Sequence, residues 1–131
     1  MGAVLLDTTV VIDLLRGRPG AVARLDRLRG QGDVPHVCAV SAEEIARGLR
    51  PNEEAAAQRL LAALRPAPLD PRDGWVAGEW RRRLSSRGRT IAQSDCLIAA
   101  AALAIGGRLA TGNPKDFPMP ELTVEHWPVG D

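Results

Sequence analysis

The pattern of hydrophobic and polar positions predicts strands that alternate with helices. Residues 3–6 form a short, continuous apolar run, which is typical of a strand buried on both faces of a parallel sheet. Residues 36–40 and 108–111 are rich enough in strand-forming residues to predict two more such strands, and residues 123–127 predict an edge strand. Because helical segments separate these runs, the sequence predicts an α/β fold with a parallel sheet.

Glycine, proline and capping residues set the limits of the expected helices. Pro19 opens a helix whose apolar Val22, Leu25 and Leu28 predict one buried face. Asp70 is expected to cap a later helix, after a short extended segment that ends at Leu69. The helices predicted in this way cover residues 10–16, 19–31, 41–48, 53–64, 70–85 and 93–105.

The composition predicts an ordinary globular domain and does not indicate a particular function. A chain of 131 residues predicts one domain spanning residues 1–131, and 45% hydrophobic with 25% charged residues is ordinary for a globular protein. The net charge of +1 does not indicate a particular partner. Cys38 and Cys96 lie in apolar segments, which favours buried free thiols in a reducing compartment over a disulfide. No signal peptide or membrane-spanning helix is predicted, so a cytoplasmic protein is expected.

Four acidic residues fall where the predicted strands end. Asp7 follows the first strand, Glu44 follows the second, Asp116 follows the strand at 108–111, and Asp95 begins the helix before that strand. The carboxyl ends of parallel strands share one edge of a sheet, where ligands bind. Two carboxylates about 4 Å apart repel by roughly 4 kcal/mol at an effective dielectric of 20, so the cluster needs protons or a cation. Oxygen ligands favour Mg²⁺ or Mn²⁺, which suits phosphodiester cleavage by an activated water.

Each acid also has a purely structural explanation. Asp7 has the position of an N-cap for the helix that follows it. Ser41 and Glu44 fit a capping box, in which the glutamate satisfies backbone donors and needs no metal. Asp95 lies in the first turn of its helix, where the helix dipole favours a carboxylate. The residues taken singly therefore leave both interpretations open.

Four separate segments of the chain together resemble a PIN domain, and among PIN domains the VapC type of bacterial toxin. These segments are VLLDTTVVID at 4–13, VSAEEIARG at 40–48, SDCLIAAAAL at 94–103 and ATGNPKDF at 110–117. The resemblance covers nearly the whole chain in order. It implies a three-layer α/β/α sandwich with a mostly parallel central sheet, Mg²⁺- or Mn²⁺-dependent endoribonuclease activity, a homodimer, and inhibition by a cognate VapB-type antitoxin.

The resemblance also assigns roles to individual residues. Glu44 rather than Glu43 matches the acid of the family's Glu-x-x-x-Gly pattern, because it stands four residues before Gly48. Asn113 stands where some members have an acid, so it is expected to orient water or phosphate, while Asp13 is expected to be solvated or structural. The implied metal-binding and catalytic residues are Asp7, Glu44, Asp95 and Asp116, and the implied substrate-binding residues beside them are Thr8, Thr111 and Asn113.

The arginine-rich segment 81–89 is a candidate surface for the RNA backbone. Arg81 and Arg82 are expected to bind phosphates, with Trp80 as a possible stacking platform. The alternative is a solvated helix face with Trp75 and Trp80 in the core or in a dimer interface.

Two other functions compete with a nuclease. A strand that ends in Asp-Thr-Thr faintly resembles the aspartyl-phosphate site of haloacid-dehalogenase-like phosphatases, but those enzymes usually carry a second acid where Thr9 stands, and the chain is short for that fold. The other possibility is a catalytically inactive PIN-like binding module that only pairs with an antitoxin or a neighbouring subunit. The near-complete set of acids favours the enzyme.

Overall fold

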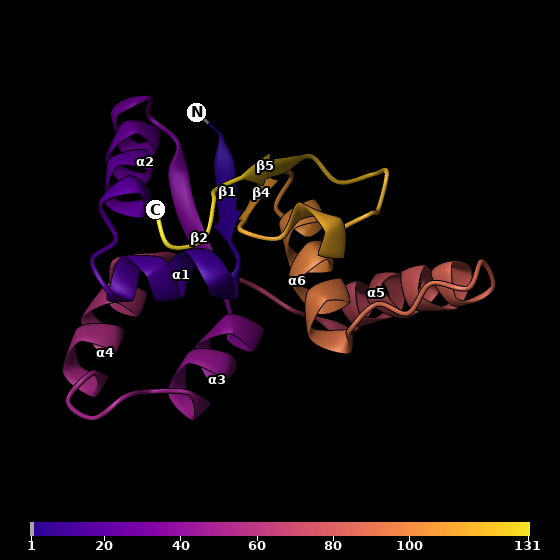
Figure 1. Cartoon of the computed structure of the whole chain (residues 1–131). Coiled ribbons are helices and arrows are strands. Elements are labelled where there is room, and N and C mark those ends of the chain that lie inside the picture. Colours follow the sequence, from indigo (N-terminus) through magenta and orange to yellow (C-terminus); the bar gives the residue numbers. More distant parts are fainter. Residues whose placement is uncertain (1) are drawn as a thin grey trace.

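The computed structural model describes residues 2–131, which form a five-stranded parallel sheet with helices on both faces (Figure 1). The order of the strands across the sheet is β3-β2-β1-β4-β5, and every neighbouring pair is parallel. The predicted α/β class with parallel strands is therefore confirmed. The strands are β1 (Ala3–Leu6), β2 (Val34–Cys38), β3 (Arg65–Ala67), β4 (Arg108–Thr111) and β5 (Val124–His126).

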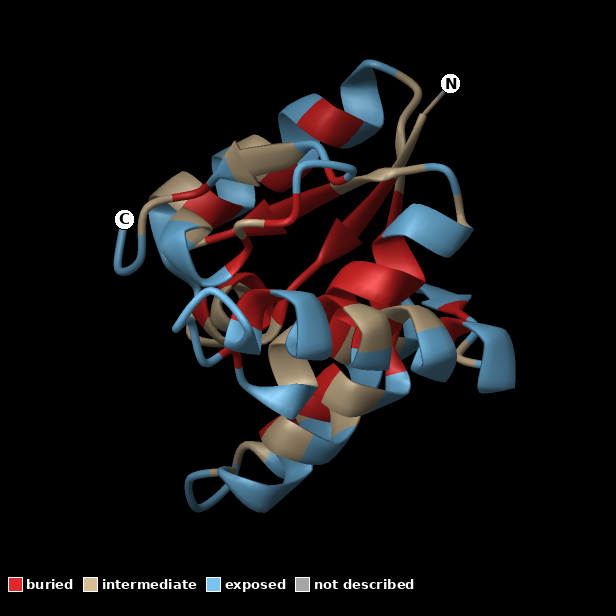
Figure 2. Cartoon of the chain, turned by 90° about the vertical axis from the view of Figure 1, so that its right-hand side faces the viewer, coloured by how far each residue is buried: buried red, intermediate tan, exposed pale blue. Residues whose placement is uncertain are grey.

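The helices form two layers that enclose the sheet. Helices α1 to α4 contribute to the apolar core on one face, and α5 and α6 contribute to the core on the other face. Figure 2 shows the buried strands between these partly exposed layers. The helices are α1 (Thr8–Leu15), α2 (Pro19–Gly30), α3 (Ala39–Arg47), α4 (Glu54–Ala62), α5 (Pro71–Ser85) and α6 (Gln93–Ala104), and a short 3₁₀ helix, η1 (Pro114–Asp116), follows β4.

The central strand β1 is buried on both faces, as its continuous apolar run predicts. Val4 and Leu6 belong to the core beneath α1 to α4, whereas Leu5 belongs to the core beneath α5 and α6. Successive side chains of a strand point to opposite faces, so a strand in the middle layer needs apolar residues at every position. The strand therefore ends at the carboxyl edge of the sheet with Asp7 as its next residue.

Several predicted boundaries shift in the structure. The strand predicted at 36–40 is β2 at Val34–Cys38, and Val40 lies in α3, where it packs against the α5–α6 core. Tertiary packing here overrides the strand preference of valine. The extended segment expected to end at Leu69 is β3, two residues earlier, and it includes Pro66. An edge strand tolerates proline because its outer backbone groups have no strand partner.

Helix α2 buries a slightly different face from the predicted one. Ala21, Leu25 and Leu28 are buried, while Val22 is exposed, so its predicted burial is wrong. The buried residues are separated by four and then three positions, so their side chains stay on one side of the helix. The predicted residues are separated by three positions each time, so their side chains turn gradually away from that side.

The prediction of two free, buried cysteines is confirmed for Cys38 and Cys96. Asp13 is structural, since its buried carboxylate accepts a hydrogen bond of 2.8 Å from the backbone N–H of Gly130. Among residues 2–131, no helix is both long enough and apolar enough to cross a membrane.

Candidate active site

Asp7 is held in place by three donors from two segments, α1 and β4, at the carboxyl edge of the sheet. Its Oδ1 accepts hydrogen bonds from Val10 N at 3.1 Å and from Thr9 Oγ1 at 2.6 Å, and its Oδ2 accepts one from Thr111 Oγ1. The predicted N-cap role of Asp7 in α1 is thus confirmed, but capping uses only part of the carboxylate. Burial raises the pKa of Asp7, and the hydrogen bonds from Thr111 and Thr9 oppose that rise.

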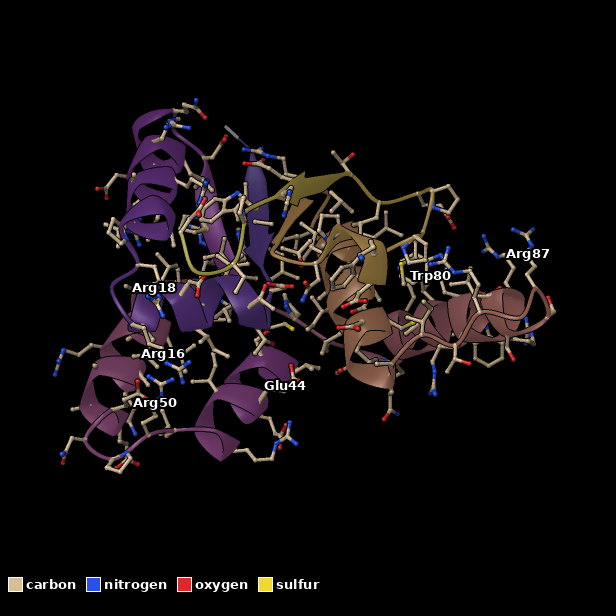
Figure 3. The ribbon with its side chains drawn as sticks, viewed as in Figure 1. Arg16, Arg18, Glu44, Arg50, Trp80 and Arg87 are labelled. Carbon is tan, nitrogen blue, oxygen red and sulfur yellow. The ribbon has the colours of Figure 1, made fainter. Side chains whose placement is uncertain are left out.

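Glu44 is held by a hydroxyl group rather than by a capping box. The N-cap residue of α3 is Cys38, so Ser41 lies inside the helix and the predicted box of Ser41 and Glu44 is wrong. Glu44 Oε1 instead accepts a hydrogen bond of 2.6 Å from Thr8 Oγ1, and Ser41 Oγ lies 3.0 Å from the same hydroxyl. Figure 3 shows Glu44 on the side of α3 nearest α6, whereas the exposed Glu43 forms an ion pair of 3.4 Å with Arg47.

Asp95 is the candidate acid whose pKa is affected by all three of the other acids. It lies in the first turn of α6, and no hydrogen bond to its carboxylate is found within residues 2–131. Burial and, after it, the charges of Asp116, Asp7 and Glu44 together raise its pKa to about 6. A helix N-terminus alone stabilises the charged carboxylate and lowers its pKa. Burial and the neighbouring charges together therefore outweigh the helix dipole that could have explained Asp95 structurally.

The four acids thus share one edge of the sheet, but they do not form a tight cluster. Within residues 2–131, no three side chains of Asp, Glu, His or Cys are grouped closely enough to hold a metal ion in the arrangement seen. The donors are nevertheless all carboxylate oxygens, and each of the other three acids disfavours ionisation of Asp95. Such a set is chemically suited to a hard divalent cation, which would relieve the repulsion.

The structure gives the predicted substrate-binding residues different positions. Thr111 is completely buried and donates to Asp7, so it positions the acid and is not accessible to a substrate. Thr8 is half-buried and orients Glu44. Asn113 is exposed in the loop between β4 and Asp116, which leaves its side chain available at the rim of the site.

Thr9 and Ser41 belong to the site although neither had been assigned a role in it. Thr9 Oγ1 donates to Asp7 and accepts a hydrogen bond of 2.9 Å from Gly112 N, so it joins the start of α1 to the loop after β4. The sequence signal for Thr9 was the Asp-Thr-Thr run. Ser41 could not be found in that way, because its role depends on α3 beginning two residues before it.

Helix α5 separates the predicted arginines from the predicted stacking residue. Trp80 is 2% exposed, and its Nε1 donates a hydrogen bond of 3.0 Å to Glu121, so the expectation of Trp80 as a stacking platform is wrong. Arg81 and Arg82 are exposed and, together with Arg89, line a surface hollow next to α6.

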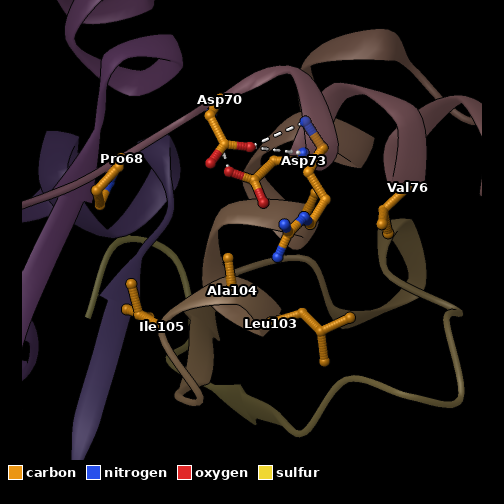
Figure 4. A pocket seen from close by; sticks show the side chains of 9 residues that line it. Pro68, Asp70, Asp73, Val76, Leu103, Ala104 and Ile105 are labelled. Carbon is orange, nitrogen blue, oxygen red and sulfur yellow. Dashed lines mark hydrogen bonds between the residues drawn. The ribbon is translucent and has the colours of Figure 1, made fainter.

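A second hollow, of about 400 Å³, lies between the start of α5 and the last turn of α6 (Figure 4). Its lining includes Asp73 and Leu103, and Asp73 shares a capping box with Asp70. Leu103 lies eight residues after Asp95 in α6, which is about 12 Å along a helix. This hollow is therefore not part of the acidic site.

The protein is a three-layer α/β/α sandwich with acidic side chains at the carboxyl edge of its parallel sheet. A model of the PIN domain matches residues 4–118, and the chain belongs to this family. Ribonuclease VapC19 of Mycobacterium tuberculosis is 34% identical over 119 residues, which are 90% of this chain and 95% of that relative. Ribonuclease VapC10 of the same species is 36% identical over 116 residues, 88% of this chain and 86% of that relative.

Solved structures agree with the fold. VapBC2 from Rickettsia felis, bound to a DNA fragment from its promoter, includes a chain that superposes with a TM-score of 0.83 at 24% identity, covering 95% of this chain and 98% of that one. DNA-bound VapBC from Salmonella typhimurium gives a TM-score of 0.84 at 22% identity, covering 97% and 99%. The three-layer α/β/α architecture that the sequence resemblance implies is therefore confirmed.

Proposed function

We propose that the protein is a divalent-metal-dependent endoribonuclease and the toxin of a VapBC-type toxin–antitoxin module. The observation that carries this proposal is the position of four acids at one edge of the parallel sheet, where burial and then the charges of the other three acids raise the pKa of Asp95. Membership of the PIN-domain family and the VapC ribonucleases among the relatives support the same activity.

The proposed cofactor is Mg²⁺ or Mn²⁺, held by Asp7, Glu44, Asp95 and Asp116. When bound, such an ion polarises a phosphodiester oxygen and lowers the pKa of a bound water. The four side chains offer only oxygen ligands, and the charges of the other three act against ionisation of Asp95, so they would have to move together around a bound ion.

The surrounding residues hold the acids ready for this role. Thr9 and Thr111 fix the two oxygens of Asp7, so that acid keeps one orientation whether or not a cation is present. Thr8 holds one oxygen of Glu44, and the other oxygen lies 3.9 Å from the guanidinium of the exposed Arg47. We assign Asn113 to orienting a phosphate or the attacking water, since it is an exposed, uncharged polar residue at the rim.

We also propose that the substrate is an RNA whose backbone is bound by Arg81 and Arg82. The proposed inhibitor is a cognate VapB-type antitoxin. The proposed oligomeric state is a homodimer, and the proposed location is the cytoplasm. The antitoxin is supported by the solved VapBC complexes, which pair a chain of this fold with its antitoxin. The RNA contact is supported by the exposure of both arginines beside α6.

The decisive experiment compares cleavage of a defined RNA by the wild-type protein in Mg²⁺, in Mn²⁺ and in EDTA. We expect cleavage only with a metal, and at least a hundredfold loss in the Asp95→Asn variant. The matched control is Asp26→Asn, which changes an exposed acid in α2. Cleavage in EDTA, or full activity of Asp95→Asn, would refute the proposal. A folded wild-type protein that cleaves no RNA with either metal, but binds an antitoxin, would indicate the inactive binding module.

A further inference from the structure

Helix α5 presents a tryptophan to solvent that the core does not use. Trp75 is 71% exposed, whereas Trp80 on the same helix is buried. The two residues are five positions apart, or about 140° around a helix, so they cannot both face the core. The alternative that placed Trp75 in the protein core is therefore wrong, while the alternative of a dimer interface stays a prediction and is one outcome of the test below.

The surface beside this indole is open. Gly74 and Gly78 lie next to Trp75 along α5, and a Cβ atom added at either glycine would meet nothing within 4 Å. The two glycines, Trp75, Glu79 and Arg82 line a hollow of about 480 Å³. The bare helix backbone leaves room for a flat group to lie against the indole. Nucleobases are flat groups that stack on exposed aromatic side chains whatever their sequence.

Arg82 joins this hollow to a strongly basic one. It also lines the neighbouring hollow, where Arg81 and Arg89 are its companions. Within residues 2–131 none of these three arginines forms an ion pair, whereas Arg83 on the same helix pairs with Glu121 at 3.4 Å. Unpaired guanidinium groups beside an exposed aromatic ring are complementary to a chain of phosphates that carries bases.

The hollow beside Trp75 and the basic hollow both lie along α5, and the basic hollow extends to the segment that precedes Asp95. The basic hollow also includes Thr90 and Ile91, which lead directly into α6 and its first-turn residue Asp95. Trp75 and Arg82 are seven residues apart in α5, about 10 Å along the helix and on nearly the same face. That length corresponds to about three stacked nucleotides at about 3.4 Å each. A strand that enters the acidic site past Arg82 would therefore bring a nearby base to Trp75.

We propose that Trp75 and the surface of Gly74 and Gly78 form a stacking subsite for an unpaired base of single-stranded RNA, with Arg82 binding the adjoining phosphate. The inference rests on the proposed ribonuclease function and adds to it a preference for unpaired nucleotides near the cleavage site. Glu79 at the edge of the hollow would repel a phosphate there, which keeps the backbone on the side of Arg82.

The test measures binding in EDTA, so that no RNA is cleaved, with a fluorescein-labelled single-stranded RNA, a duplex RNA and inorganic polyphosphate as probes. Trp75→Leu removes the aromatic ring and keeps an apolar side chain, while Trp75→Phe keeps a ring. The matched control is Val22→Ala, which alters another exposed apolar residue on a different helix. Because Trp80 and Trp127 are buried, quenching of tryptophan emission by the RNA reports mainly on Trp75.

We expect Trp75→Leu to raise the Kd for single-stranded RNA by about five- to a hundredfold, since loss of one stacked base costs about 1–3 kcal/mol. Trp75→Phe should recover most of that loss, and binding of duplex RNA and polyphosphate should not change. Unchanged binding of single-stranded RNA by Trp75→Leu would overturn the inference. An equal loss for polyphosphate, or a change from dimer to monomer in sedimentation, would also overturn it, the latter by assigning Trp75 to a contact between copies.

Cleavage by the wild-type protein in Mg²⁺, measured in parallel, separates the two proposals. Trp75-dependent binding of single-stranded RNA without any cleavage would support the subsite and refute the ribonuclease. Normal cleavage and normal binding by Trp75→Leu would refute the subsite and leave the ribonuclease standing.

Discussion

Replacing Asp95 by asparagine should stabilise the metal-free protein while it abolishes activity. The ionised carboxylate of Asp95 is disfavoured by burial and by the charges of Asp116, Asp7 and Glu44, which together raise its pKa from 3.8 to about 6. A pKa difference of one corresponds to about 1.36 kcal/mol, so the unfavourable free energy at neutral pH is at most about 3 kcal/mol. Solvent screening around this half-buried side chain reduces the expected gain to about 1–2 kcal/mol.

The sign of the pH dependence follows from the same pKa. Between pH 3.8 and about 6 the folded state holds a proton on Asp95 that the unfolded state has lost. Stability contributed by this group therefore falls as the pH rises through that window, and the loss is complete above it. Asparagine carries no charge at any pH, so the advantage of Asp95→Asn should be present at pH 7.5 and should shrink at pH 5.

The assay is thermal unfolding in EDTA at these two pH values, followed by circular dichroism. For a chain of 131 residues, the expected gain raises the Tm at pH 7.5 by roughly 3–10 °C. In parallel scans without EDTA, Mg²⁺ should stabilise the wild-type protein more than the variant, because the variant lacks one ligand. The Asp26→Asn control should show neither effect. A lower Tm for Asp95→Asn at pH 7.5, or the same difference at pH 5, would contradict the proposed repulsion.

Three further substitutions test the residues that position the site and the sheet. Thr8→Val removes the donor to Glu44 and should lower RNA cleavage about ten- to a hundredfold without unfolding the protein, as measured by initial rates. Thr111→Val leaves the buried Asp7 without one donor and should lower the free energy of unfolding in urea by about 1–3 kcal/mol. Gly107→Ala would place a Cβ atom 2.5 Å from a β1 carbonyl oxygen and should destabilise the fold by about 1–3 kcal/mol in the same assay.

Matched variants control for these changes. Thr123→Val alters an exposed threonine that makes no side-chain hydrogen bond within the described part of the chain, so it should leave both stability and cleavage unchanged. Gly30→Ala adds a Cβ atom where nothing lies within 4 Å and should be neutral or slightly stabilising. If Thr8→Val cleaves RNA as fast as Thr123→Val does, the hydrogen bond to Glu44 has no positioning role. Equal stabilities of Gly107→Ala and Gly30→Ala would contradict the close approach of Gly107 to β1.

The parallel sheet and the edge occupied by the acids could be predicted from the sequence because both depend on local pattern. The continuous apolar run of β1 indicates burial on two faces, and Asp7 follows it directly. The Ser41 and Glu44 capping box could not be judged in this way, because whether it forms depends on where α3 begins. The helix begins at Ala39, where Val40 can reach the α5–α6 core, and that contact joins residues far apart in the sequence.

The arrangement of the site was harder to predict than its members. The sequence indicated which acids share an edge, but the hydroxyl groups that hold them come from several segments, and their contacts depend on three-dimensional packing. Thr111 shows this limit: the resemblance implied a substrate contact, and its complete burial instead gives it a supporting role. For Trp75 and Trp80 the angular separation around α5 already indicates that only one of the two can face the core, and the structure buries Trp80.

Two of the four acids depend on adjacent residues of the chain. Asp7 is itself one ligand candidate, and its neighbour Thr8 fixes Glu44 across the gap to α3. A single residue inserted between Leu6 and Asp7 would therefore displace both Asp7 and the hydroxyl that holds Glu44, because the two residues directly follow the end of β1. A change in the length of this junction would thus disturb two of the four acids in one step, whereas the loop between α3 and α4 carries none of the four carboxylates.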